Sequence, residues 1–392
     1  MSTDGASPLL IVAHPSPDVY GSDRQLLETI DGVIAAGWRV VVVVPLTGPL
    51  IPLLEERGAK VLVDAFPVLR KSLLNPVGLV KLLLSTGAGA ARLTRRLRAA
   101  GADAVYVNTV TIPVWLLAAR LARVPVLAHV HEAEEDQPRL IRSTLAAPLL
   151  LANDILVNSA AAEAALVGSI SRLGKKITIV HNGVPSPATP PNPPRRRAIG
   201  DPAKIALVGR LSPRKGIDVA LEAVALLHNQ GRAVELTVCG SIFPGYEPYE
   251  AELRARAAQP DLAGSVTLAG YVNPTWPVLA DSDVVLVPSR TEPFGNAAVE
   301  GLLAERPVVA SGVQGLKEVI QDGKTGILVP PSDPVALAAA IARFLDDPDY
   351  AEATAAAGLA DAGDRFSLSG YRGKIVDALR RIAPGALDRA SR

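Results

Sequence analysis

The chain has 392 residues, which is long enough for two domains that each bury a core. Its 40 Lys and Arg residues nearly balance 39 Asp and Glu residues, and the formal net charge of +1 gives no overall field that attracts nucleic acid. A single cysteine, Cys239, excludes an internal disulfide framework, so we expect a cytoplasmic protein. The segment MSTDGASPLL has no basic region, so we do not interpret it as a signal peptide.

The first half alternates short apolar runs with helical segments. The runs have the Val- and Leu-rich character of buried parallel strands, and clear helical periodicity separates some of them. The expected strands are residues 9–13, 38–45, 60–66, 104–108, 125–131, 154–159 and 177–182, and the clearest helices are 25–37 and 114–124. This alternation predicts a doubly wound parallel sheet with helices on both faces, in a domain of residues 1–184.

A proline-rich segment, residues 185–197, separates the two halves. It can neither continue a helix nor pair within a sheet, and it ends in three arginines, so we place the domain linker here. The alternation then restarts, which predicts a second domain of the same kind over residues 198–367. Its expected strands are residues 204–209, 235–240, 265–270, 283–288 and 307–311. Residues 368–392 are expected to form a C-terminal helix.

The stretch PSRTEPFGNAAVEGLLA, residues 288–304, places Glu292 and Glu300 around a turn between an apolar strand and a helix. Ligands of such sheets gather at the carboxyl ends of strands. Backbone N–H groups around Gly295 and Asn296 would face an anion or a hydroxyl at the helix N-terminus. Glu300, one turn into that helix, could accept hydrogen bonds from ligand hydroxyls.

The stretch VGRLSPRKGID, residues 208–218, supplies Arg210 and Lys215 beside a predicted helix that starts near Gly216. Fixed cations there could bind a phosphate group, which would also face the helix N-terminus. The alternative is a basic surface turn in which Arg214 points to water. We find no paired Asp-x-Asp motif and no cluster of His or Cys ligands, so we expect no catalytic metal. The acidic run HEAEED, residues 131–136, is more simply a surface turn.

These elements occur together with Asn182-Gly183-Val184 and with a glycine-rich hairpin, DGKTGILV, at residues 322–329. In this order they resemble the retaining glycosyltransferases of family 4, also called glycosyl transferases group 1. The resemblance is close over residues 178–345. It implies the GT-B fold, in which two Rossmann-like domains face each other across a cleft and a C-terminal helix crosses back to the N-terminal domain.

The resemblance implies that a sugar moves from a UDP- or GDP-sugar to an acceptor hydroxyl with retained configuration, in the synthesis of envelope polysaccharide, glycolipid or glycoconjugate. No further cofactor is implied. Arg210 and Lys215 would bind the diphosphate, Glu300 the ribose and Glu292 the donor sugar. Other donor contacts would come from the backbone N–H groups of Phe294, Gly295 and Asn296, and from the backbone near Tyr271 and Val272 at the nucleobase.

On the N-terminal side, Gly21 would lie near the diphosphate and the acceptor. The family commonly has a second glycine where this chain has Ser22, so the acceptor contacts of this loop are open. His129 and His131 end a predicted strand, where alternation places both on one face. His131-Glu132 matches the family's His-Asp or His-Glu element, whose histidine contacts the transferring sugar, and His129 is assigned to the acceptor side.

Residues 69–98 mix aliphatic side chains with seven basic residues and contain no acidic one. Such a stretch could lie on an anionic bilayer, at the inner face of the plasma membrane, and would then favour a lipid-linked acceptor. The alternative is an ordinary pair of amphipathic helices with a solvated basic face and a soluble sugar or small-molecule acceptor.

Other classes of protein share this architecture. A nucleotide-sugar-binding protein without turnover would not need the complete set of Arg210, Lys215, Glu292 and Glu300. A dinucleotide-dependent oxidoreductase would need a G-x-G-x-x-G turn after the first strand, and AHPSPDVYGS has one glycine. A phosphorylase or epimerase of the same fold stays open, as do the donor base and sugar, the acceptor, the pathway and the oligomeric state.

Overall fold

The computed structural model describes residues 7–19, 21–69, 76–132, 138–194, 198, 200–243 and 245–386, with the backbone alone for 76–86. Its contacts divide the chain into two compact units. Unit 1 comprises Met1–Gly183 and Leu368–Arg392, and unit 2 comprises Val184–Ser367. Residues 133–136 of the acidic run, the arginines at 195–197 and the basic residues at 70 and 71 lie outside the described part of the chain.

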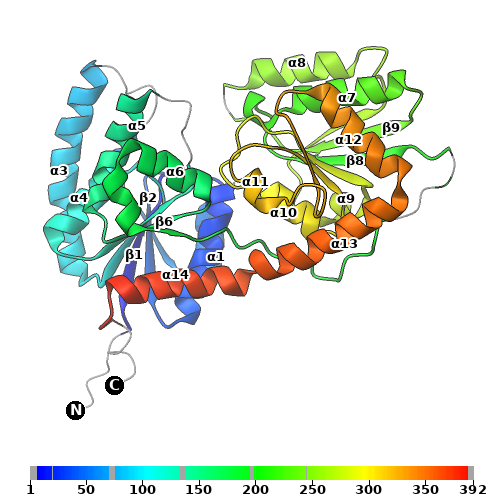
Figure 1. Cartoon of the computed structure of the whole chain (residues 1–392). Helices are drawn as coiled ribbons and strands as arrows, with labels where there is room; N and C mark the ends of the chain where they lie inside the picture. Colours follow the sequence, from blue (N-terminus) through cyan, green and yellow to red (C-terminus); the bar gives the residue numbers. More distant parts are fainter. Residues whose placement is uncertain are drawn as a thin grey trace. The chain divides into compact units, whose positions relative to one another are not determined.

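Unit 1 is built on a parallel sheet with the order β3-β2-β1-β4-β5-β6-β7 (Figure 1). The order reverses beside β1, which is the signature of a doubly wound sheet. Buried Val, Leu, Ile and Ala side chains fill most of the central strands, as expected for a sheet covered on both faces. The strands are β1 (Leu9–Ala13), β2 (Arg39–Val44), β3 (Lys60–Val63), β4 (Ala104–Val107), β5 (Val126–Val130), β6 (Asp154–Val157) and β7 (Ile177–Ile179).

Alternate residues of these strands pack against helices on opposite faces of the sheet. The first face is covered by α3 (Pro76–Ala100), α4 (Pro113–Ala122) and α6 (Ala160–Ser169). The second is covered by α1 (Gly21–Ala35), α2 (Leu50–Glu56) and α14 (Leu368–Ile382). The unit also contains α5 (Arg139–Ala146), η2 (Ala147–Leu151) and η3 (Ser171–Lys176). Residues 76–98 of the basic stretch lie in one long helix, α3, rather than in the pair of helices considered from the sequence, and residues 70–75 lie outside the described part.

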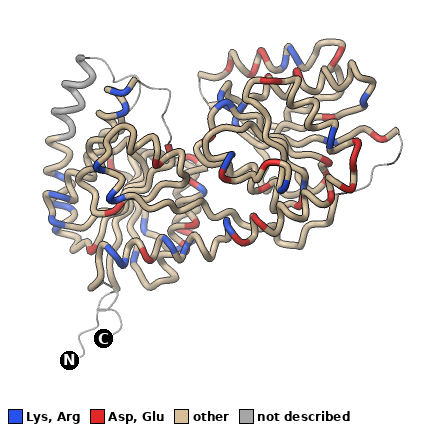
Figure 2. Tube along the Cα trace, viewed as in Figure 1, with Lys and Arg blue, Asp and Glu red and all other residues tan. Residues whose placement is uncertain are grey.

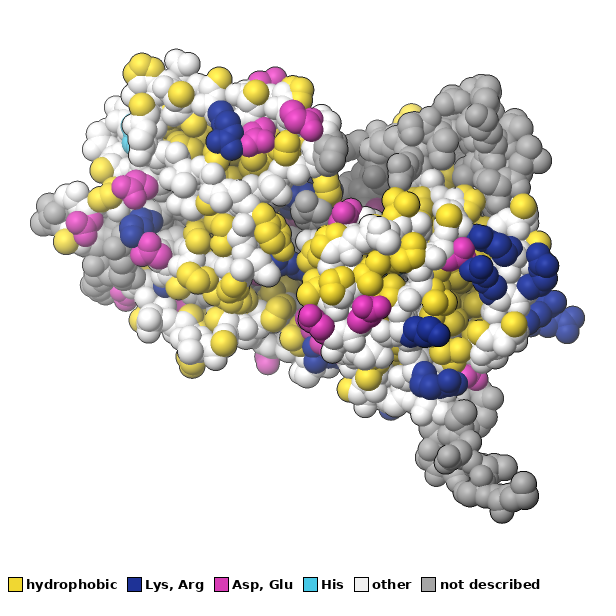
Figure 3. All heavy atoms as spheres, turned by 180° about the vertical axis from the view of Figure 1, so that it is seen from behind, with side chains coloured by type: hydrophobic (Ala, Val, Ile, Leu, Met, Phe, Trp, Pro, Cys, Tyr) yellow, Lys and Arg dark blue, Asp and Glu magenta, His cyan; other side chains and the backbone are white. Residues whose placement is uncertain are grey.

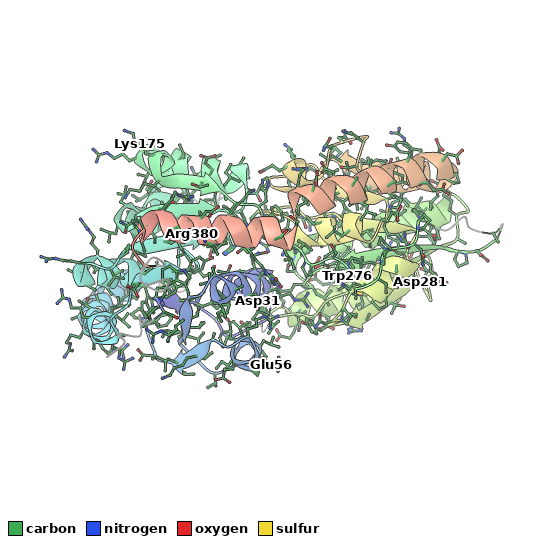
Figure 4. The ribbon with its side chains drawn as sticks, turned by 90° about the horizontal axis from the view of Figure 1, so that it is seen from below. Asp31, Glu56, Lys175, Trp276, Asp281 and Arg380 are labelled. Carbon is green, nitrogen blue, oxygen red and sulfur yellow. The ribbon has the colours of Figure 1, made fainter. Side chains whose placement is uncertain are left out.

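Helix α14 lies alongside α1, although the two are far apart in the sequence (Figure 4). Gly32 lets them approach, because a Cβ atom there would lie 2.7 Å from the Cβ of Arg372. The Arg372 guanidinium donates to Glu28 at 2.6 Å and to Asp31 at 2.8 Å. The C-terminal helix thus completes the core of unit 1, as the expected return of the chain requires. It ends at Ile382, and residues 387–392 lie outside the described part.

Unit 2 contains a second parallel sheet, with the order β10-β9-β8-β11-β12-β13. Its strands are β8 (Ala203–Val208), β9 (Val234–Cys239), β10 (Val266–Gly270), β11 (Val284–Val287), β12 (Val308–Ser311) and β13 (Ile327–Val329). The prediction of a hairpin at residues 322–329 is wrong for its second arm, residues 327–329. After a tight turn, β13 pairs in parallel with β12, because Ile327 and Val329 bury their side chains at the edge of the sheet.

The helices of unit 2 also cover both faces. On one side lie α7 (Ile217–Asn229), α8 (Glu247–Ala257) and α12 (Pro334–Asp346). On the other lie α9 (Trp276–Asp281), α10 (Asn296–Leu303), α11 (Leu316–Val319) and α13 (Pro348–Arg365). A short 3₁₀ turn, η4 (Pro213–Lys215), precedes α7. Both units therefore have the doubly wound, Rossmann-like architecture expected from the alternation.

The proline-rich segment is attached to unit 2. Arg306 is 3 % exposed, and its guanidinium donates to the carbonyl oxygens of Asn192 at 2.8 Å, Leu279 at 3.2 Å and Ala280 at 2.6 Å. Burial lowers the pKa of this arginine, although nearby carboxylates oppose the shift. Residues 185–194 contain neither helix nor strand, yet the contact at Asn192 fixes them to the unit that follows.

Candidate functional site

The first cluster of polar side chains in unit 2 lies where the strand order reverses. Strands β8 and β11 are neighbours in the sheet, although about 75 residues separate them along the chain. The loop after β8 carries Lys215, and the loop after β11 carries Glu292. Parallel strands present their carboxyl ends at one edge of the sheet, so the two loops meet there. This position is where ligands of open α/β sheets bind.

Lys215 and Glu292 form an ion pair between Nζ and Oε2, with side chains that are 16 % and 10 % exposed. Ser289 also donates to Oε2, at 3.3 Å. Burial raises the pKa of Glu292, but the charges of Lys215 and Arg214 and the hydrogen bonds from Lys215 and Ser289 outweigh it. The pKa therefore lies below its ordinary value, and the carboxylate is ionised near neutral pH.

The turn that follows Glu292 is held by close backbone packing. The Glu292 N–H donates to Gln314 Oε1 at 2.9 Å, and its carbonyl accepts from the Gly315 N–H at 3.1 Å. Gly295 has φ +113°, and a Cβ atom there would meet Leu316 at 2.5 Å. The predicted residues Phe294, Gly295 and Asn296 thus form a rigid helix N-terminus beside the ion pair.

Glu300 lies one turn further along α10 and is half-buried. Its Oε2 accepts from Thr275 Oγ1 at 3.2 Å, so its carboxylate faces the segment after β10. The predicted base-contacting residues, Tyr271 and Val272, belong to the same segment, and Tyr271 is 52 % exposed. The two glutamates therefore occupy different surroundings, as the different roles assigned to them require.

Arg210, also after β8, places its guanidinium over the Phe243 ring at 4.0 Å from the ring centroid. A neighbouring clamp ties the two loops together. Arg290 donates to both carboxylate oxygens of Asp218, at 2.9 and 2.5 Å, and Tyr249 donates to the same group at 2.8 Å. Burial raises the pKa of Asp218, but these hydrogen bonds outweigh it and lower the pKa. The sequence motifs gave no sign of this clamp.

In unit 1, Gly21 begins α1 and is exposed, and a Cβ atom there would meet nothing within 4 Å. Its packing in this unit therefore does not require glycine. The neighbouring Ser22 Oγ lies 3.5 Å from Asp23 Oδ1, a weak contact at most. Asp23 itself is buried and bonds to His14.

His129 and His131 do lie on one face, with ring centroids 4.1 Å apart. His131 Nε2 lies 2.8 Å from Asn108 Oδ1, and His129 Nδ1 lies 2.5 Å from the Tyr106 hydroxyl. Burial lowers the pKa of His131 to about 3, with His14 adding to the shift, and burial likewise holds the pKa of His129 well below its usual range. Both rings are therefore neutral near neutral pH. Glu132 accepts from the His131 backbone N–H at 3.0 Å.

Two polar residues of unit 1 that belong to none of the sequence motifs are His14 and Asn108. Each directly follows a central strand, β1 or β4, and these two strands flank the reversal of order in the first sheet. Their backbone N–H groups continue the ladder, to Val43 and to Ala13, both at 3.1 Å. The sequence does contain a signal for both residues, because each is a polar residue directly after a buried apolar strand.

The basic stretch, residues 69–98, has fewer unpaired basic side chains than its sequence indicated. Asp64, after β3, accepts from Arg92 at 3.1 Å and also pairs with Arg96. Figure 2 shows basic residues along the described part of α3, and Figure 3 shows Lys and Arg side chains gathered at that edge of unit 1. None of the helices in the described ranges is long and apolar enough to cross a bilayer. The described residues also contain no group of three acidic, His or Cys side chains placed to hold a metal.

Two family models match the chain one after the other. The model described as Glycosyltransferase Family 4 matches residues 19–186, and the model described as Glycosyl transferases group 1 matches residues 191–360. Together they cover most of the two units.

Curated relatives include the alpha-D-kanosaminyltransferase of Streptomyces kanamyceticus, 30% identical over 189 residues, which are 48% of each chain. The D-inositol 3-phosphate glycosyltransferase of Streptomyces scabiei is 33% identical over 276 residues, 63% of this chain and 60% of the relative. In most such alignments the chain spans about half the length of the curated relatives it matches.

Solved structures match over nearly the whole chain. The Anabaena protein Alr3699/HepE in complex with UDP-glucose has a TM-score of 0.78 at 22% identity, covering 95% of this chain and 99% of that one. The apo form of the lipopolysaccharide outer core galactosyltransferase WaaB has a TM-score of 0.71 at 16% identity, covering 95% and 99%. With two Rossmann-like sheets and both family models matched in order, the chain belongs to the glycosyltransferases of the family 4, group 1 type, which have the GT-B fold.

Proposed function

We propose that this protein transfers a sugar from a nucleoside diphosphate sugar, a UDP- or GDP-sugar, to an acceptor hydroxyl with retention of the anomeric configuration. The observation that carries the proposal is the Lys215–Glu292 ion pair beside the N-terminus of α10, at the point where the second sheet reverses its order. A cation, an ionised carboxylate and a helix N-terminus together suit a diphosphate linked to a sugar with several hydroxyls.

The residues then have distinct roles. Lys215 and Arg210 offset the negative charge that develops on the departing diphosphate, and Glu300 accepts hydrogen bonds from the ribose hydroxyls. Glu292 and the backbone N–H groups of residues 294–296 hold the donor sugar. With these fixed cations the reaction proceeds without a catalytic metal. A UDP-sugar is supported by the structural neighbour described in complex with UDP-glucose.

In unit 1, His131 contacts the transferring sugar, and Gly21 and Ser22 serve the acceptor side. His129 is fully buried, so it serves the acceptor side through the His131 ring that it contacts. No carboxylate is placed by the matched motifs to form a glycosyl-enzyme. We therefore propose that the leaving phosphate oxygen helps to take the acceptor proton on the same face of the sugar. The acceptor is a sugar, a lipid-linked saccharide or a small molecule with a free hydroxyl.

A thermal-shift screen of UDP-, GDP- and ADP-sugars tests the donor site, since a ligand that binds the folded state raises the melting temperature by mass action. One nucleotide series should stabilise the wild-type protein, and Lys215→Met should lose most of that stabilisation. Lys204→Met is the matched control, because Lys204 pairs with Asp281 on the exposed surface of the same unit. Equal stabilisation of both variants would contradict a diphosphate at Lys215.

We also propose peripheral association of unit 1 with an anionic membrane through the basic face of α3. The exposed residues Arg95, Arg96 and Arg98 support it, and the pairs that Asp64 makes with Arg92 and Arg96 weaken it. Replacing Arg92, Arg95 and Arg96 by glutamine should reduce co-sedimentation with anionic vesicles at low salt. If the wild-type protein binds neutral vesicles as well as anionic ones, the basic face of α3 is exposed to solvent rather than bound to a membrane. A soluble acceptor then becomes the better proposal.

A further inference from the structure

A chain of buried polar groups runs through unit 1 from helix α1 to the end of β5. His131 Nε2 lies 2.8 Å from Asn108 Oδ1, and Asn108 Nδ2 lies 3.0 Å from His14 Nδ1. His14 Nε2 lies 2.8 Å from Asp23 Oδ1. His14 is fully buried, and Asn108 and Asp23 are 2 % and 5 % exposed. Polar groups buried so deeply need partners of the correct polarity, and here each supplies one for the next.

The direction of the chain follows from its last member. An ionised carboxylate can only accept, so Asp23 requires a proton on His14 Nε2. Asn108 Nδ2 faces His14 Nδ1 at 3.0 Å, so this ring nitrogen accepts from the Asn108 NH₂ group. The Asn108 carbonyl oxygen is left for His131, which must donate from Nε2. Nδ1 of a neutral His131 consequently carries a lone pair.

That Nδ1 atom is buried and, among the residues that the structure describes, lacks a hydrogen-bond partner. A buried acceptor without a partner in a native protein marks a place for a ligand or water group. We propose that Asp23, acting through His14 and Asn108, sets the tautomer of His131, so that its Nδ1 accepts a hydrogen bond from the ligand. The group it takes is therefore a hydrogen-bond donor, such as a hydroxyl, rather than a carboxylate or phosphate oxygen.

The identity of that hydroxyl rests on the proposed function, in which His131 contacts the transferring sugar. The tautomer itself does not depend on it. Asp23, His14 and Asn108 are positioning residues in this account, because they act on the ligand only through His131. A sugar with a hydroxyl at this place would be accepted, whereas an anionic group there would face a lone pair.

The ring-nitrogen NMR spectrum of the full chain, labelled with ¹⁵N-histidine, tests the proposal without any substrate. The chain has five histidines, so single His→Gln variants suffice to assign their signals. In the wild-type protein at about pH 7, His131 should carry its proton on Nε2 and none on Nδ1, and His14 should likewise be protonated on Nε2 alone. A proton on His131 Nδ1, or protons on both nitrogens of His14, would reverse the chain and overturn the proposal.

Variants then test which residue sets the tautomer. Asp23→Asn can present either an oxygen or an NH₂ group to His14, so His131 should show a mixture of tautomers, with an Nδ1–H signal that the wild-type spectrum lacks. Asp31→Asn is the matched control on the same helix, and it should leave the His131 signals unchanged. Unchanged signals in a folded Asp23→Asn variant would overturn the relay. If that variant fails to fold, the wild-type spectrum alone still decides the tautomer.

The two proposals fail separately. A wild-type protein that shows the expected tautomer but transfers no sugar from any donor would refute the proposed function and leave the relay standing. A protein that transfers sugar while His131 carries its proton on Nδ1 would refute the relay and leave the proposed function standing.

Discussion

Replacing Lys215 by methionine removes the cation that the buried Glu292 carboxylate faces. Breaking a buried ion pair by removing one partner costs about 3–5 kcal/mol when the remaining charge has no other support. Here Ser289 still donates at 3.3 Å and the Arg214 charge remains, so we expect a loss of about 2 kcal/mol in the free energy of unfolding near pH 7. Lys204→Met should cost less than about 1 kcal/mol, because its pair with Asp281 is exposed.

The loss should depend on pH, because the pKa of Glu292 differs between the two proteins. In the wild-type protein the folded pKa lies below the unfolded value of about 4.3, so the pair stabilises the fold above that pH and ceases to do so as the pH falls through the folded pKa. Without Lys215, burial should raise the pKa of Glu292 in the folded variant above its unfolded value of about 4.3. The buried glutamate then destabilises the folded variant as the pH rises, because it must ionise without its partner. The difference in the free energy of unfolding between the wild type and Lys215→Met should therefore decrease as the pH falls from about 7 to about 4.5.

Urea unfolding at both pH values, followed by tryptophan fluorescence, measures this gap. The double variant Lys215→Met with Glu292→Gln should recover part of the loss, since it leaves no buried charge unpaired. A gap that stays constant with pH, or a Lys215→Met variant no less stable than Lys204→Met, would refute the buried ion pair.

Three further predictions concern transfer itself. Glu300→Gln should weaken UDP binding about tenfold in isothermal titration calorimetry, and unchanged affinity would overturn the ribose assignment. Glu292→Gln should lower the rate at saturating donor, so a change confined to KM would contradict its role at the sugar. Arg210→Ala should lose about 2–4 kcal/mol of transition-state stabilisation, and the wild-type protein should stay active in EDTA. Activity abolished by EDTA and restored by Mn²⁺ would argue for a metal instead.

The strands could be predicted from the sequence because buried parallel strands read as short Val- and Leu-rich runs. Residues 9–13, for example, coincide with β1 (Leu9–Ala13). β13 was mistaken for the arm of a hairpin, since its three residues directly follow a glycine-rich turn. Its parallel partner, β12, follows from the sheet order and not from the local pattern.

The sequence could predict residues of the candidate site only where they belong to a recognisable motif. The motifs identified Lys215 and Glu292 separately, but their pairing depends on β8 and β11 being neighbours, which no local pattern encodes. The contact of Arg306 with the proline-rich segment likewise required the folded unit. Asp64 lies outside the basic stretch in sequence and neutralises part of it in space, so a charge count along the chain overestimated the free basic surface.

The anomeric configuration of the first product tests the central claim most directly. After the thermal-shift screen has identified the donor, ¹H NMR can follow transfer to an acceptor sugar before any later isomerisation. We predict a product glycoside with the same anomeric configuration as the donor sugar. An inverted product, or hydrolysis of the donor with no transfer to any acceptor hydroxyl, would contradict the account.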